Sequence, residues 1–387
     1  MARRRGTPVP LHTERQRNMR IAIMLAALCV LAAVALAADE QPKPGKFVVK
    51  QVDNPVYRSN EIFMACEDLH SPRCQEWRKR YKLDEALAGK TDEWERILAL
   101  RHWVKTHMQI ENKHPTPVRG EEFAIMDSAL AGGKFHCGQF CVVLNATLNS
   151  CGYLTRRVYC GPGTADKGAH ATDETWVNRL SKWVMVDAKY DQHFEKDGVP
   201  LSALEIRDEV LKDGAKSVKR VVPEGTDLKA PEYSEPFGPD PDCYRFVAWD
   251  VNTNRFTSFP AAPCSTYWVW SDKFWKENTW YYEGSKHWAY GPGLFIGVEN
   301  RDWLEWTPNT INSSVKVDGR QGQIELASFT PGFKTYQLKA GDGQWTDCTD
   351  RLSLPLENKP NSFVFRAVNL ADVTGPEHRV EIDWQGQ

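Results

Sequence analysis

Three side chains that can carry out nucleophilic chemistry follow one another in the order cysteine, histidine and aspartate, at Cys137, His170 and Asp187. A thiol becomes a strong nucleophile when an imidazole and a helix N-terminus stabilise its thiolate. In such an arrangement the histidine takes the thiol proton and later gives it to the leaving amine, while the carboxylate holds the other ring nitrogen. The order and spacing therefore predict a catalytic triad at these three positions.

The oxyanion that forms in such a reaction needs hydrogen-bond donors close to the thiol. The backbone N–H of Cys137 is a natural donor, because we expect this residue at the start of a helix. Gln139 and His136 are the neighbouring candidates for a second donor, and the sequence leaves the choice between them open. Asp191 and His193 are alternatives for the acid and the base of the triad.

A helix over Cys137–Ser150 is expected to position the thiol. Gly132 and Gly133 precede it as a flexible approach, and Gly152 stands where the helix should stop. The apolar stripe of this helix consists of Phe140, Leu144 and Leu148. A strand is expected directly after it, over Tyr153–Cys160.

A β-hairpin is expected to position the histidine and the aspartate. If Asn178 and Arg179 form a two-residue turn, His170 and Asp187 stand directly opposite each other, with Cβ atoms about 5 Å apart. This register favours the pair over the alternatives. Strand alternation also places Glu174 on the face of His170, where we expect it to be a structural partner.

Two further helices are expected around this hairpin. Thr91 is a good N-cap for an amphipathic helix over Trp94–Met108, which precedes the thiol. The stretch Pro200–Gly214 is amphipathic as well and follows the hairpin.

The motifs around the three residues resemble those of the transglutaminase-like superfamily, a papain-like fold that includes transglutaminases, peptide N-glycanases and bacterial cysteine proteases. The matching segments are GKFHCGQFC at 133–141, CGYLTRRV at 151–158, HATDETW at 170–176 and KWVMVD at 182–187. The resemblance covers roughly 100 of the 387 residues. Cys141 stands where the family commonly has Ala or Ser, and Thr172 where Trp is common.

The resemblance implies an α+β fold in which the nucleophile helix packs on an antiparallel sheet. It implies that Cys137 is the nucleophile, His170 the base and Asp187 the orienting acid, with Gln139 and Glu174 as candidates for supporting or substrate-side roles. The implied activity is that of a cysteine hydrolase or acyltransferase on protein or peptide amides. The implied chemistry requires no metal or organic cofactor.

The acyl acceptor remains open at this point. Water makes the enzyme a cysteine protease or amidase, which is the interpretation we favour, and an amine makes it a protein-glutamine gamma-glutamyltransferase that cross-links proteins. An N-glycan amidase is a further alternative. A different class of function is a non-catalytic surface binding module, for which a disulfide at Cys137 would be strong support.

Charge and cysteines bear on the partners and the compartment. The net charge is −2, and no block of Lys and Arg follows the first few residues, so a nucleic-acid surface is not expected. Ten cysteines, less Cys29 in the N-terminal apolar segment, leave nine. An odd number in an oxidising compartment indicates one free thiol, and proximity suggests the pairs Cys66–Cys74 and Cys243–Cys264. No CxxC pair supports a zinc site.

The N-terminus predicts export. Residues 21–37 form an apolar run between Arg20 and the acidic Asp39, and they end in an Ala-x-Ala sequence. This is typical of a secretory signal, which makes the protein secreted, periplasmic or cell-surface. The alternative is an uncleaved anchor through residues 21–37, with the catalytic domain outside the cytoplasm.

The chain divides into four expected parts. Residues 1–38 are the signal or anchor, 39–230 the catalytic core, 231–310 a Trp-rich extension of the core, and 311–387 a fibronectin/Ig-like β-sandwich. Within the core, residues 39–60 are expected as an extended entry segment. The tryptophans of the extension predict either core packing or a platform that binds a sugar or a peptide. They are residues 249, 268, 270, 275, 280, 288, 303 and 306.

Overall fold

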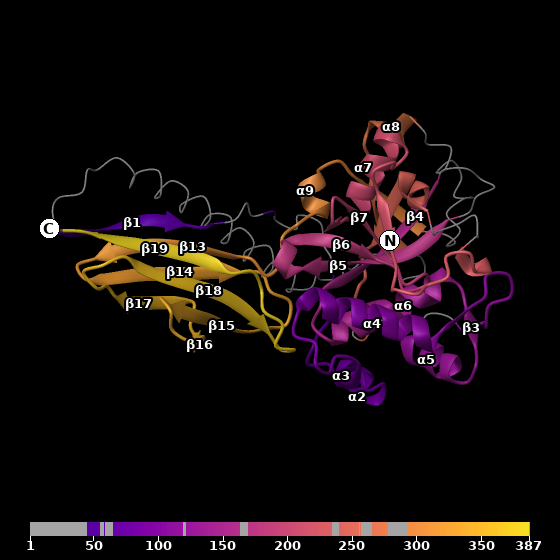
Figure 1. Ribbon diagram of the computed structural model, residues 1–387, viewed down its shortest axis with the longest axis horizontal. Helices are drawn as coiled ribbons and strands as arrows, with labels where there is room; N and C mark the ends of the chain where they lie inside the picture. Colours follow the sequence, from indigo (N-terminus) through magenta and orange to yellow (C-terminus); the bar gives the residue numbers. More distant parts are fainter. Residues whose placement is uncertain are drawn as a thin grey trace, which may run out of the picture.

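The computed structural model has two units that lie end to end (Figure 1). It describes residues 45–54, 58, 65–118, 121–162, 169–233, 240–254, 256, 265–277 and 293–386. The apolar run at 21–37 lies outside these residues. No helix in the described part of the chain is long and apolar enough to cross a membrane.

A six-stranded sheet organises the first unit, in the order β12-β11-β10-β4-β5-β6. Its strands are β4 Thr155–Gly161, β5 His170–Val177, β6 Lys182–Val186, β10 Phe246–Asp250, β11 Ser265–Trp270 and β12 Gly293–Val298. Neighbouring strands are antiparallel, except that β11 and β12 are parallel. The part we expected as an extension of the core thus contributes three strands to the same sheet as the candidate histidine.

One face of this sheet carries the helix that begins with the candidate nucleophile. α6 (Cys137–Ser150) packs against β5 and is buried along nearly its whole length. Its neighbours in this layer are α2 (Pro72–Arg80), α3 (Leu83–Ala86), α4 (Glu93–His107) and α5 (Glu122–Leu130) (Figure 1). Asp92, and not Thr91, caps α4, because its side chain accepts a hydrogen bond from the Glu95 N–H. The short strands β2 (Gln109–Ile110) and β3 (Lys134–Phe135) pair in front of α6.

The other face of the sheet is covered by later segments of the chain. α7 (Ala203–Asp213) packs against β10 and against the 3-10 helix η3 (Pro241–Arg245). Three short strands form a separate sheet here, namely β7 (His193–Lys196), β8 (Val199–Pro200) and β9 (Lys219–Val221). The remaining short elements of this unit are η1 (Asn178–Leu180), η2 (Pro231–Tyr233), α8 (Lys273–Glu277) and α9 (Arg301–Leu304). Helices and a mostly antiparallel sheet confirm the α+β class.

The described tryptophans of the 231–310 stretch lie mainly inside the first unit. Trp249 is fully buried in the core beneath α7, and Trp268, Trp270 and Trp303 pack against the same core. Trp306 is buried in a smaller cluster with Trp176 and Trp183. These described side chains therefore pack in the core and do not form an exposed platform. Trp280 and Trp288 lie outside the described residues.

The second unit consists of two antiparallel sheets that share one core. The five-stranded sheet has the order β1-β19-β18-β15-β16 and the three-stranded sheet the order β13-β14-β17. Their strands are β1 Lys46–Val52, β13 Ile311–Asp318, β14 Gln321–Ser328, β15 Phe333–Ala340, β16 Thr346–Cys348, β17 Arg351–Pro355, β18 Asn361–Asn369 and β19 His378–Gln385. Phe47, Ile324 and Phe365 are among the side chains of both sheets that form the common core. Residues 46–52 are therefore not an entry segment of the first unit, because β1 pairs with β19.

Cysteine pairing differs from what proximity suggests. Cys74 is a buried free thiol among the described residues, so the expected Cys66–Cys74 bridge is wrong. Cys243 is a thiol as well, and its expected partner Cys264 lies outside the described residues. Cys137 is likewise in no disulfide within the described structure.

Candidate active site

The thiol of Cys137 lies at the first position of α6 because the preceding residue closes the helix end. The His136 Nδ1 atom accepts a hydrogen bond from the Gly138 N–H at 3.0 Å, and the Gln139 Oε1 atom accepts one from the His136 N–H at 3.1 Å. These two bonds form a capping box in which a histidine takes the place usually held by Ser or Thr. In the described structure no backbone acceptor is seen for the Cys137 N–H. This group can therefore donate to an oxyanion, as expected.

His170 and Asp187 come together as the sequence predicts, but in a different register. The His170 Nε2 atom lies 2.8 Å from the Asp187 Oδ2 atom, and both side chains are buried. The ladder pairs Asp173 with Val186, so the hairpin is shifted by two residues from the predicted one. The cause is a longer connection, since η1 and the left-handed Ser181 (φ 49°) separate the strands. A shift of two residues keeps the same side chains on each face, so His170 and Asp187 meet diagonally.

The Asp187 carboxylate is fixed by the turn that follows it. Its Oδ1 atom accepts hydrogen bonds from the backbone N–H groups of Lys189 (2.9 Å) and Tyr190 (3.4 Å). The backbone of Asp187 also exchanges two hydrogen bonds with Gln192. A carboxylate held in this way cannot rotate from the imidazole without breaking several hydrogen bonds, so it orients the His170 ring.

The electrostatics of the site favour a thiolate and an imidazolium. Burial opposes ionisation of Cys137, but hydrogen bonds with His136 and His170 and the charges of His170 and Lys189 hold its pKa well below the usual value. Burial also opposes the imidazolium, but the Asp187 carboxylate and the Cys137 thiolate raise the pKa of His170 to about 10. Because Nε2 faces Asp187, Nδ1 is the ring nitrogen left for Cys137. The pair can thus exist in its ionised, nucleophilic form near neutral pH.

Gln139 does not supply the second oxyanion donor in this structure. Its Nε2 group donates to the backbone carbonyls of Thr116 (3.0 Å) and Val118 (2.6 Å), and the side chain is buried. Its amide therefore fastens the 116–118 loop to the start of α6, next to the thiol. This role is a supporting one.

Glu174 is fully buried in the core of the sheet. Its carboxylate accepts hydrogen bonds from the guanidinium of Arg156, from the Trp249 Nε1 group and from the Ala203 N–H. The Arg156 and Glu174 side chains are each only 1% exposed. The Arg156 guanidinium also lies 3.9 Å from the ring centroid of Trp183. Glu174 thus joins β4, β10 and the N-terminus of α7 into one packed structure.

The two alternative residues, Asp191 and His193, belong to a separate network on α4. The Asp191 carboxylate accepts hydrogen bonds from Arg101 Nε at 2.8 Å and pairs with His102 Nδ1 at 2.5 Å. His193 Nδ1 faces Arg101 at 3.0 Å and His193 Nε2 faces Glu195 at 2.9 Å. These residues anchor the segment after Asp187 to α4, and none of their contacts reaches the thiol.

This network makes stability depend on pH in a defined window. Burial and the neighbouring Arg101 lower the pKa of His193 to about 4, whereas an unfolded histidine titrates near 6.5. The unfolded chain therefore binds a proton first as the pH falls, and we expect about 2–3 kcal/mol of the unfolding free energy to be lost between pH 6.5 and pH 4. Urea unfolding of the wild type and of His193→Gln across this range measures the effect. Equal pH slopes in the two proteins would contradict the prediction.

Cys141, one turn along α6, does not compete with Cys137 as a nucleophile. It is buried among Tyr159, Ala171 and other apolar side chains. Burial, followed by the nearby Asp173, raises the pKa of its thiol well above the usual value. A neutral buried thiol is a poor nucleophile. The departure from the family pattern at this position thus leaves the Cys137 chemistry unchanged.

Two residues near the site were missed by the sequence analysis. Lys189 is buried, its ammonium group contacts Asn112 and Tyr190, and its charge helps to lower the pKa of Cys137. His136 was considered as an oxyanion donor, but not as the N-cap of α6. The one available signal was the position of His136 three residues before Gln139, the spacing of a capping box. For Lys189, the sequence around it carries no recognisable pattern.

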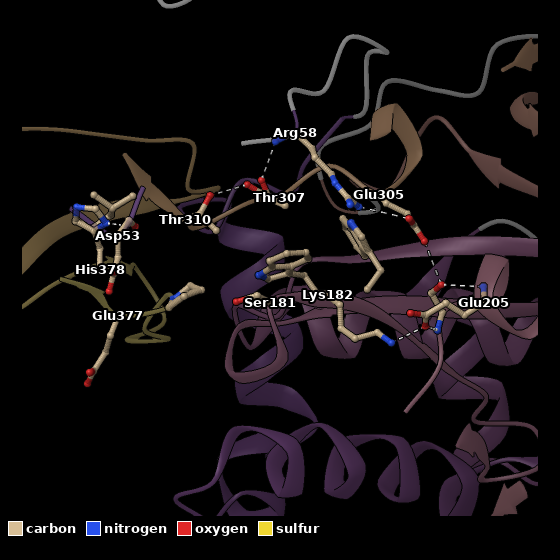
Figure 2. Close-up of a pocket in the computed structure, with 15 residues that line it drawn as sticks. Asp53, Arg58, Ser181, Lys182, Glu205, Glu305, Thr307, Thr310, Glu377 and His378 are labelled. Atoms are coloured by element: carbon tan, nitrogen blue, oxygen red, sulfur yellow. Dashed lines mark hydrogen bonds and ion pairs between the residues drawn. The ribbon is translucent and has the colours of Figure 1, made fainter. Parts of the chain in front are cut away.

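A cavity of about 450 Å³ lies away from these residues, at the junction of the two units (Figure 2). Its wall includes Trp176 at the end of β5, about 20 Å along the strand from His170 at about 3.3 Å per residue. Two ion pairs join charged groups of its lining, Lys182 with Glu205 and Arg58 with Glu305. Among the described residues no cluster of His, Cys, Asp and Glu could hold a metal ion.

Comparison with known proteins agrees with the motifs. Residues 81–188 match the transglutaminase-like superfamily. The matched segment runs from the helices before the thiol to the residue after Asp187, so it contains all three candidate residues. The predicted resemblance is confirmed over this segment. No curated protein matches the chain.

Proposed function

We propose that this chain, which carries a transglutaminase-like domain over residues 81–188, is a thiol enzyme that cleaves protein or peptide amides. The observation that supports this most strongly is the 2.8 Å contact between His170 Nε2 and Asp187 Oδ2, which leaves the other ring nitrogen for a thiol at a helix N-terminus. This combination stabilises a thiolate, which a merely structural cysteine does not need.

The proposed reaction has two steps. The Cys137 thiolate attacks the amide carbonyl, the backbone N–H of Cys137 donates to the oxyanion, and the His170 imidazolium protonates the leaving amine. This gives a thioester between the enzyme and the acyl part of the substrate. Neutral His170 then takes a proton from water, the resulting hydroxide attacks the thioester, and the thiolate leaves with the imidazolium restored.

Water is the acceptor that we favour over an amine. A cross-linking transglutaminase would need a shielded channel that brings an amine to the thioester, and the Trp-rich stretch was the candidate for its wall. The described tryptophans in that stretch pack mainly in the interior instead. The cross-linking enzyme is the second candidate, because it would use the same three residues.

The experiment is a comparison of products with and without a primary amine. We expect the wild type, incubated with casein, to generate new N-termini or deamidated glutamines, and dansylcadaverine to be incorporated only weakly. Cys137→Ala should abolish the products, whereas Cys348→Ala, which removes a partly buried thiol in the second unit, should not. Stoichiometric incorporation of the amine would favour the cross-linking enzyme. Products that persist in Cys137→Ala would contradict thiol catalysis.

We further propose an exported location for the protein and a fibronectin/Ig-like fold for the second unit. The apolar run at 21–37 and its Ala-x-Ala end support secretion, or an anchor that leaves the enzyme outside the cytoplasm. The two-sheet unit at 311–387 with β1 has the strand lengths and alternation of a fibronectin/Ig-like sandwich. A non-catalytic surface module remains the alternative if Cys137 proves unreactive.

A further inference from the structure

Two buried cysteines face each other in the core on the side of the sheet away from α6. Cys160 on β4 is fully buried and Cys243 in η3 is 5% exposed. Their Sγ atoms are 3.8 Å apart, although the residues are 83 positions apart in the chain. The Cys243 Sγ atom also faces the Cys160 carbonyl oxygen at 3.9 Å.

The surroundings of this pair hold it in place on several sides. Val158, Met185 and Val247 are among the apolar side chains of the same core. η3 runs directly into β10, where Val247 pairs with Cys160 in the sheet. The pairing fixes the backbone of Cys160 and ends at Phe246, three residues after Cys243. The two sulfur atoms, 3.8 Å apart, must therefore approach to about 2 Å for a disulfide to form.

Neither thiol has a role in the proposed reaction, and the pair is also no metal site, since no cluster of metal-ligating side chains occurs among the described residues. Two thiols that are buried together at this distance are a preformed site for oxidation. We propose that Cys160 and Cys243 form a disulfide that fastens η3 to the strand next to the candidate histidine. This inference stands apart from the proposed function, because it would hold equally for a binding module.

The bond forms by exchange with an oxidant of the disulfide class, such as oxidised glutathione. One cysteine thiolate attacks the oxidant and expels one thiolate, and the second cysteine then attacks the mixed disulfide and expels the other. The protein loses two protons and two electrons, and the oxidant becomes two thiols. Because burial raises the pKa of Cys160 well above its usual value, exchange in the folded protein is slow. We therefore place the reaction in folding, before η3 is packed.

The bond lies next to the candidate site. Cys160 pairs with His170 across β4 and β5, and its Sγ atom lies 3.7 Å from the His170 carbonyl oxygen. η3 also carries the buried Tyr244. A covalent link at this point joins the end of β4, beside the start of β5, to η3, which is also held by a hydrogen bond from Arg207 Nε to the Arg245 carbonyl.

Peptide mapping of the full-length protein tests the proposal directly. Trypsin places Cys160, Cys243 and Cys264 on separate peptides, at residues 158–167, 230–245 and 256–273. We expect protein secreted into an oxidising compartment, alkylated before digestion, to show the first two peptides joined and lighter by two hydrogen atoms than their sum. Recovery of both peptides in alkylated form would overturn the proposal, and so would a link between Cys243 and Cys264.

Thermal unfolding gives an independent readout. Under oxidising conditions Cys160→Ala and Cys243→Ala should each lower the unfolding midpoint by roughly 10 °C, and the double variant should lie close to either single one. When the proteins are denatured with a reductant and refolded, the wild type should lose the bond. The difference in unfolding midpoint between wild type and variants should then shrink to the effect of losing a buried thiol. Cys141→Ala is the matched control, because it removes a buried free thiol and should show the same small effect in both conditions. The bond would be contradicted if the decreases in unfolding midpoint of the two single variants added up in the double variant and were the same with and without the reductant.

Discussion

Alkylation of Cys137 by iodoacetamide should be almost as fast at pH 6 as at pH 8, and His170→Ala should abolish this independence of pH. The wild-type thiol is already ionised in this range, because hydrogen bonds and charges from its neighbours outweigh burial and lower its pKa. Without the imidazole the thiol should approach the ordinary pKa near 8.5, so its labelling rate should rise close to 100-fold between pH 6 and pH 8. The shape of the profile is the better measure, because a thiolate of low pKa is also intrinsically less nucleophilic.

Three controls make the result specific. Asp187→Asn should give an intermediate profile, because the imidazolium loses the charge that raises its pKa but keeps a hydrogen-bond partner. Cys137→Ala should lose the fast labelling, since Cys141 is buried and neutral at these pH values and burial raises the pKa of Cys348 to about 11. His107→Ala, which removes a histidine that stacks on Trp103, should label like the wild type. An ordinary thiol profile in the wild type would exclude the proposed enzyme.

Removal of Glu174 should produce the largest loss of stability among single substitutions in the sheet. Glu174→Ala leaves the guanidinium of Arg156 buried without its counter-ion, since the Arg156 side chain is 1% exposed. It also removes the acceptor of Trp249 Nε1 and of the Ala203 N–H. Breaking a buried ion pair by removing one partner costs about 3–5 kcal/mol. Urea unfolding followed by tryptophan fluorescence measures the change.

A double variant distinguishes the contribution of the Arg156–Glu174 ion pair from that of the packing around it. Arg156→Met combined with Glu174→Leu replaces both charges by apolar groups of similar size. It should recover the part of the loss that comes from the unpaired guanidinium, while Trp249 Nε1 and the Ala203 N–H stay without their acceptor. Glu277→Ala is the control, because it breaks an exposed ion pair with Lys273 and should cost no more than about 1 kcal/mol. A loss below 1 kcal/mol in Glu174→Ala would show that the buried pair is not a main support of the sheet.

Local elements could be predicted from the sequence because their signals are local. The helix over Cys137–Ser150 has the predicted bounds, and the strand predicted over Tyr153–Cys160 is β4, Thr155–Gly161. The helix after the hairpin is shorter than predicted, at Ala203–Asp213, because Ser202 and Glu205 form a capping box and Gly214 ends it. Such caps shift a boundary by a few residues without changing the element.

Pairing between distant segments could not be predicted. β4 pairs with β10, and β1 pairs with β19. No pattern in the sequence of these strands indicates which strand is the partner. The same limit applies to the cysteines, because Cys160 and Cys243 approach each other only through the pairing of β4 with β10. Proximity in sequence was the wrong guide for Cys66 and Cys74.

The contact between the candidate catalytic residues was more predictable than the contacts of the residues that hold them in place. The contact between His170 and Asp187 follows from strand alternation, which survived an error of two residues in the turn. An error of one residue would have placed the two side chains on opposite faces. Gln139 and Lys189 could not be placed, because their partners come from loops whose course depends on the whole fold.

The pairing of β1 with β19 has a consequence for the order of assembly during synthesis. Lys46 faces Gln385 in this ladder, so the edge strand β1 is synthesised long before its partner β19 and cannot pair until β19 has left the ribosome. The sheet of the first unit lies wholly between them in the chain, and its strands can pair while translation continues. Until β19 has been synthesised, Phe47, which is buried in the finished core, lacks its partner strand. During this interval β1 is an unpaired edge strand, which favours aggregation.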